Sequence, residues 1–148
     1  MLTESFSAIS QRLTDHLRQK NITLSQTDAQ PGPQQNKPAV GIRMELLCFG
    51  HESIKNYLPG SPAGNSIYSF NFFIIATGAT YSEKLLLTEH ISTYLDQNPF
   101  LPFPIGTDQY EMSLSPLIVD LEFINSFWLA QQQPHAPVLF YQARISAA

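Results

Sequence analysis

The sequence is poor in charged residues. Asp, Glu, Lys and Arg make up 14% of its 148 residues, against about 25% in typical soluble domains. Because the buried centres of protein interfaces are depleted in Lys, Glu and Asp, this deficit predicts a surface that is built into an assembly. The alternative is that Gln, Asn, Ser and Thr replace charge on the surface of an ordinary monomer. Composition leaves both interpretations open.

Basic residues are scarcer than acidic ones. Eight Lys and Arg stand against twelve Asp and Glu, which gives a formal net charge of -4, and the sequence contains no basic cluster. Proteins bind nucleic acid largely by neutralising phosphates with Lys and Arg. We therefore expect no nucleic-acid partner.

Cysteine and long apolar runs are also nearly absent. Cys48 is the only cysteine, so an internal disulfide is excluded and a reducing compartment is expected. The first twenty residues carry charges within their apolar face, so they contain no signal-peptide core. No run reaches the roughly 20 apolar residues that a membrane-spanning helix requires. These features predict a cytosolic protein without a membrane span.

Motifs that carry chemistry are missing as well. There is no Gly-x-Ser-x-Gly elbow and no glycine-rich phosphate loop. Cys48 alternates with apolar residues, so we expect it to be buried and protonated. No histidine stands at a recognised metal-ligand spacing from another ligand; the four are His16, His51, His90 and His135. We expect no catalytic residue, no metal and no cofactor, although dispersed residues that converge only in space stay open as an alternative.

Apolar periodicity predicts three helices. The first spans about residues 3–20, and a capping box of Thr80 and Glu83 opens the second, which ends at Asn98 and Pro99. Asp120 is predicted to cap the third. The buried stripes are expected to be Leu2, Phe6, Ile9, Leu13 and Leu17 in the first helix; Leu87, Ile91, Tyr94 and Leu95 in the second; and Leu121, Ile124, Phe127 and the core residue Trp128 in the third.

Alternation of apolar and polar residues predicts the strands. Residues 40–49, 110–114 and 138–145 alternate as half-buried strands do. Residues 68–76 are apolar on both faces toward their end, which is typical of a central strand covered on two sides. The inward residues are predicted to be Val40, Ile42, Met44, Leu46 and Cys48 in the first strand and Leu139, Tyr141, Ala143 and Ile145 in the last.

Several segments without periodicity are candidate contact surfaces. Residues 29–38 form a proline-rich loop, and residues 50–65 are too apolar for a free linker, so we interpret them as a docking loop. Pro102 and Pro104 predict that residues 100–106 are irregular, and this apolar stretch either packs over its own sheet or contacts a neighbouring subunit. The candidate interface residues are Ile54, Tyr57, Leu58, Phe100, Leu101, Phe103 and His135.

The order of these elements predicts an α+β fold in a single domain over residues 1–148. We expect a mixed β-sheet of about four to five strands, packed with about three helices in a single layer. The absence of a regular alternation of strands and helices argues against a doubly wound fold.

Two stretches carry a resemblance to a family. Residues 87–99 are similar to a helix followed by an Asn-Pro or His-Pro break, and Leu114-Ser115-Pro116-Leu117 through Trp128 resembles a closing helix with a central tryptophan. In these features, and in most of the chain taken in order, the sequence resembles the tube-terminating cap proteins of phage-tail-like contractile injection systems. It differs from that family in residues 50–65 and in the proline-rich stretch after Pro99.

The resemblance implies a structural role like that of phage tail terminators. Such a protein forms a ring of six copies of itself, closes the end of the inner tube that is distal to the baseplate, and holds the last layer of the sheath. The expected partners are therefore the chain itself, an inner tube protein and a sheath protein. Assembly would take place in the cytoplasm, and the finished particle is either released or anchored. Two alternatives stay open: another adaptor or anchoring module of such particles, and an enzyme with a dispersed site.

Overall fold

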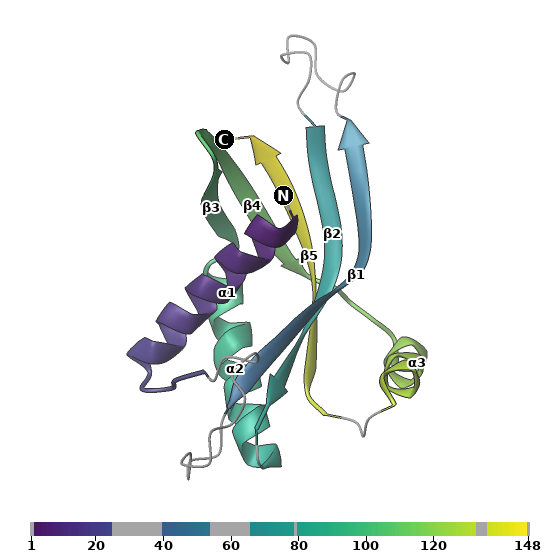
Figure 1. Ribbon diagram of the computed structural model, residues 1–148. Helices are drawn as coiled ribbons and strands as arrows, with labels where there is room; N and C mark the ends of the chain where they lie inside the picture. The colour runs from purple at the N-terminus through teal and green to yellow at the C-terminus, as the bar shows by residue number, and fades with distance from the viewer. Residues whose placement is uncertain (1, 25–39, 54–65, 79, 133–135, 148) are drawn as a thin grey trace.

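The structure, a computed structural model, describes residues 2–24, 40–53, 66–78, 80–132 and 136–147 (Figure 1). It confirms the α+β class, with three helices and a five-stranded sheet in this part of the chain. The elements in chain order are α1 (Leu2–Gln19), β1 (Gly41–Ser53), β2 (Ser66–Thr77), α2 (Tyr81–Gln97), β3 (Phe100–Ile105), β4 (Asp108–Pro116), α3 (Leu121–Gln131) and β5 (Val138–Ala147).

The strands lie in the order β1-β2-β5-β4-β3, and all four neighbouring pairs are antiparallel. The expectation of a mixed sheet is thus corrected. The reason lies in the connections, because α2 carries the chain from β2 to the far edge of the sheet, and α3 then returns it to the centre as β5. The parallel pairing that the described residues do contain is an isolated bridge between Leu24 and Val40.

Helices cover both faces of the sheet, which corrects the prediction of a single helical layer. In Figure 1, α1 and α2 lie on one side of the sheet and α3 lies on the other. Strand β2 supplies both cores, since Phe72 and Ile74 pack beneath α1 and α2 whereas Phe73 and Ile75 pack against α3. The prediction that this strand is covered on two sides is confirmed.

The buried helical stripes are largely as predicted. Side chains from α1 and α2 join β2, β3, β4 and β5 in the larger core, and Trp128 lies in the smaller one at 3% exposure. The exception is Leu121, which we expected on the buried side of α3 and which is 72% exposed. The buried apolar residues of the helices are Ile9, Leu13 and Leu17 of α1, Leu87, Ile91 and Leu95 of α2, and Phe127 and Trp128 of α3.

A β-bulge in β1 changes which way Cys48 points. Leu46 pairs with Phe72 and Cys48 with Asn71, so Leu47 is an extra residue on β1. The bulge places Cys48 beside Asn71, whose Nδ2 donates a hydrogen bond to the Cys48 Sγ over 3.2 Å. Cys48 is consequently exposed, and the prediction of a buried thiol, which assumed unbroken alternation, was wrong.

Residues 100–105 form a regular strand, which corrects the prediction of an irregular segment. The Leu114 amide donates to the Pro99 carbonyl over 2.7 Å, so the odd-numbered residues of β3 direct their backbone groups toward β4. Pro102 and Pro104 occupy the intervening positions and face the free edge, where no ladder partner is needed. Proline is tolerated in such positions of an edge strand.

Side-chain caps begin α2 and α3, as the sequence predicts. The Glu83 amide donates to the Thr80 hydroxyl over 3.2 Å, and the Thr80 amide donates to the Glu83 carboxylate over 3.3 Å. At α3 the Phe123 amide donates to the Asp120 carboxylate over 2.8 Å. These bonds satisfy amides at the first turn that have no partner within the helix.

Removing the hydroxyl of Thr80 should destabilise the protein. We expect Thr80→Ala to lower the free energy of unfolding by about 1 kcal/mol, measured by urea denaturation at neutral pH. Thr93→Ala, at an exposed position of the same helix, is the matched control and should be neutral or slightly stabilising, because alanine has the higher helix propensity. Equal losses in the two variants would contradict the capping role.

Candidate functional site

The predicted interface residues divide into three groups. Phe100 is 65% exposed and borders a shallow groove of about 280 Å³ on the outer face of β3 to β5. Leu101 and Phe103 are each 4% exposed and belong to the larger core. The remaining candidates, Ile54, Tyr57, Leu58 and His135, lie outside the described residues.

The burial of Leu101 and Phe103 corrects their assignment as interface residues. Successive side chains of a strand point to opposite faces of a sheet, so two residues of β3 face α1 and Phe100 faces away from it. Of the two alternatives for residues 100–106, packing over their own sheet is the one that holds for Leu101 and Phe103.

Large apolar side chains are exposed on two opposite sides of the molecule. On α2 they are Tyr81, Leu85 and Leu86, which we call the α2 surface. Around α3 the most exposed are Ile118, Leu121 and Leu129, which we call the α3 surface; Leu121 and Leu129 are 72% and 79% exposed. Because the sheet separates the two helices, the two surfaces cannot cover each other within one chain (Figure 1).

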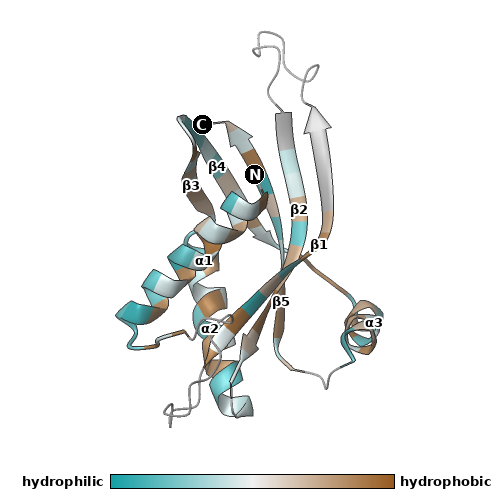
Figure 2. Ribbon diagram, viewed as in Figure 1, coloured by the Kyte–Doolittle hydropathy of each residue, from teal (hydrophilic) through white to brown (hydrophobic). Residues whose placement is uncertain are grey.

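The exposed side of helix α3 mixes apolar and polar residues, since Leu121 and Leu129 lie there together with Glu122, Asn125 and Ser126. Figure 2 shows the helix coloured mostly toward the hydrophobic end of the scale. Glu122 is its one charged residue, whereas α1 has a clear polar side that is teal in the same view. The large apolar side chains exposed among these polar residues are candidates for contact with a partner.

The two edges of the sheet differ in their capacity to pair. At one edge, Pro102 and Pro104 remove two of the amides that β3 would otherwise present outward. At the other edge, β1 is 13 residues long and, within the described part of the chain, pairs along its length only with β2. The sheet therefore has one edge blocked by prolines and one that retains its donors.

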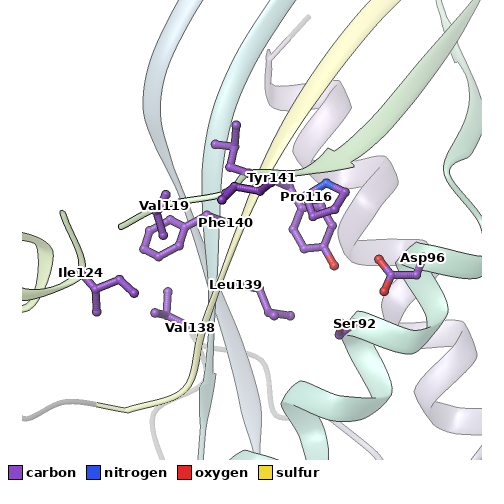
Figure 3. Close-up of a pocket in the computed structure, with 11 residues that line it drawn as sticks. Ser92, Asp96, Pro116, Val119, Ile124, Val138, Leu139, Phe140 and Tyr141 are labelled. Atoms are coloured by element: carbon purple, nitrogen blue, oxygen red, sulfur yellow. The ribbon is translucent and has the colours of Figure 1, made fainter. Parts of the chain in front are cut away.

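A groove opens where the first residues of β5 extend beyond the end of β4. The last pair between these strands joins Pro116 to Tyr141, and the Leu117 amide then donates to the Phe140 carbonyl over 2.9 Å. Beyond this point Val138 and Leu139 pair with β2 on one side only, among the residues described. The space left beside them measures about 350 Å³ and lies between α2 and α3 (Figure 3).

The two walls of this groove differ in polarity. Val119, Ile124, Val138 and Phe140 make the wall on the α3 side, and all are apolar. Ser92 and Asp96 of α2 face Leu139 and Tyr141 on the other side, where the Tyr141 phenol points toward α2. Burial raises the pKa of the Tyr141 phenol; a hydrogen bond with Ser92 acts in the opposite direction, and the nearby Asp96 carboxylate adds to the rise.

His16 packs between two helices and lies in no metal-binding cluster among the described residues. The His16 ring of α1 stacks on Tyr94 of α2, with 4.3 Å between ring centroids. Burial lowers the pKa of His16, and the positive charges of Lys20 and His90 lower it further. In the part of the chain that the structure describes, no group of three His, Cys, Asp or Glu side chains is placed to hold a metal ion.

No helix of the described residues is long and apolar enough to cross a membrane. Comparison with known proteins gives no match, either to a family model or to a curated protein.

Sequence reasoning missed the groove and the α3 surface. The groove depends on the different lengths of two strands that pair in space, and Pro116, which ends β4, was the one local signal for it. The α3 surface had a clearer signal, since residues 121–131 contain no basic residue and only one acidic residue.

The packing of His16 predicts a pH dependence of stability. Its pKa in the folded state lies below the ordinary value of 6.5, so the unfolded chain binds the proton more readily, and the free energy of unfolding should decrease as the pH falls below that value. We expect urea denaturation at about pH 7.5 and pH 5.5 to show this loss in the wild type.

Variants assign that loss to one residue. His16→Gln cannot be protonated and should reduce the decrease. His90→Gln should keep most of it, because burial is the largest cause of the shift at His16. An unchanged decrease in His16→Gln would show that other groups produce it.

Proposed function

We propose that this protein is a structural cap of a contractile injection system, which forms a ring at the end of the inner tube distal to the baseplate and anchors the last layer of the sheath. The observation that carries the proposal is the exposure of large apolar side chains on two opposite sides of the sheet, the α2 surface and the α3 surface. The resemblance of residues 87–99 and 114–145 to cap proteins supplies the identity of the assembly.

Two separate apolar surfaces favour association between unlike faces. An isologous dimer buries the same patch on both subunits and would leave the second patch exposed, whereas heterologous contacts use both patches and form a ring when the rotation between neighbours closes. Large apolar side chains that gather on an exposed surface mark interaction sites on soluble proteins. The low charge of the chain, 14% of residues, is consistent with burial of its surface in an assembly.

The open edge at β1 supports contact with the sheath. A strand from a sheath subunit that paired with β1 would gain backbone hydrogen bonds without any conspicuous side-chain motif. The prolines of β3 direct such pairing to β1. A structure of the complex without strand pairing between the chains would remove this part of the proposal.

The α3 surface should be required for assembly. The purified wild-type chain is expected to have a mass several times 16.6 kDa, with six copies as the number that the resemblance implies, and Leu121→Asp should shift it toward the monomer. Asn125→Asp, one turn further along the exposed side of α3, adds the same charge without removing apolar surface and is the control. Mass photometry or light scattering gives the answer.

The role in the particle is tested by assembling particles with and without the protein. Electron micrographs should show tubes of uncontrolled length when the protein is absent, and a ring at the tube end when it is present. A monomeric wild-type chain that is missing from the particle ends would overturn the proposal. A monomer that nevertheless binds elsewhere on the particle would favour an adaptor.

A further inference from the structure

The groove beside β5 has a strand edge as its floor. The Phe140 carbonyl points toward β4, because it accepts the Leu117 amide. Backbone groups of residues two apart in a strand point the same way, so the amide and carbonyl of Val138 are directed into the groove, away from β2. These two backbone groups need a hydrogen-bond partner, which is either water or a ligand.

An extended chain lying in this position would alternate its side chains between the two walls. A residue that aligns with Val138 would point toward the apolar wall on the α3 side, and the next residue, aligned with Leu139, would point toward Ser92 and Asp96 (Figure 3). Each wall of the groove would therefore select one half of the residues of the incoming segment.

The charge of the groove determines which charged residues the incoming segment can carry. Asp96 is the only charged residue among those that line the groove, and it makes no ion pair within the described part of the chain. A carboxylate at the rim of an interface favours a basic partner and discourages an acidic one.

We propose that this groove binds a short extended segment of another polypeptide in which apolar residues alternate with Lys or Arg. A second copy of this chain is a poor source, because in its sequence no apolar residue has Lys or Arg as both of its immediate neighbours. The segment pairs with Val138 through its backbone, places apolar side chains against Val119 and Ile124, and places its basic side chains near Asp96. This site goes beyond the proposed cap function and does not require the ring.

Synthetic peptides test the selectivity of the groove. The probes are the blocked, fluorescently labelled hexapeptides Val-Lys-Val-Lys-Val-Lys and Val-Glu-Val-Glu-Val-Glu, with binding to the full chain measured by fluorescence anisotropy. The basic peptide should bind about tenfold more tightly than the acidic one. Equal affinities, or no binding of the basic peptide at millimolar protein, would overturn the proposal.

A charge reversal locates the interaction. Asp96→Lys should remove the preference for the basic peptide or reverse it. Glu89→Lys makes the same change on an exposed position of α2 that does not line the groove, and should leave the preference within about twofold of the wild type. The same loss in both variants would mean that the overall charge of α2, and not the groove, selects the peptide.

Backbone pairing has its own readout. In two-dimensional NMR spectra the Val138 amide should be among the resonances most shifted by the basic peptide. N-methylation at alternate residues of the peptide, on the edge that would face β5, should abolish binding. Tight binding of the methylated peptide, or shifts confined to other parts of the chain, would contradict strand pairing.

These results are separable from those for the ring. Leu121→Asp should lose assembly and keep the peptide preference, whereas Asp96→Lys should keep its assembled mass and lose the preference. Failure of the cap proposal therefore leaves the groove testable, and the reverse is also true.

Discussion

The packing of β2 on both of its faces is the constraint on which the rest of the structure depends. Its aromatic and β-branched run is buried against α1 and α2 on one side and against α3 on the other. Phe6 of α1 packs on Phe72, with 5.7 Å between ring centroids, while Phe127 of α3 packs on Phe73 at 4.8 Å. One strand thus fixes the positions of both helical layers.

This arrangement also determines which surfaces remain available. Because the core on the α3 side is small, α3 touches the sheet through Phe123, Ile124, Phe127 and Trp128, and Leu121 and Leu129 remain exposed. Arg43 ties the end of the helix in place, with its guanidinium 5.6 Å from the Phe73 ring centroid and 2.7 Å from the Gln131 side-chain oxygen. The groove follows from the same geometry. Helices α2 and α3 lie on opposite sides of β5, and the first residues of β5 extend beyond the end of β4.

The sequence was sufficient to predict features that depend on neighbours along the chain. The capping box at Thr80, the cap at Asp120 and the alternation of β5 are such features, and each is present as predicted. The failures arose where the answer depends on partners in space. Pro102 and Pro104 are compatible with a strand only if that strand lies at an edge, and no local pattern shows where a strand lies in a sheet.

The same distinction explains Cys48 and the helical layers. A single extra residue at Leu47 was enough to change the direction of the thiol, and alternation read from the sequence has no means to detect it. The side of the sheet on which α3 packs depends on the path of the chain after β4. The apolar composition of α3 was visible from the start, yet only its position away from α1 and α2 turns that composition into an unpaired surface.

The prolines of β3 have a consequence for how this sheet can grow. A sheet whose two outer strands are both free to pair can add strands without limit, as amyloid does. This sheet can add a strand beside β1, but the prolines of β3 prevent the same addition on the opposite side. If a strand were added at β1, β3 would offer no matching edge for the next one, and this asymmetry would suit the role at the tip of a polymer that we propose.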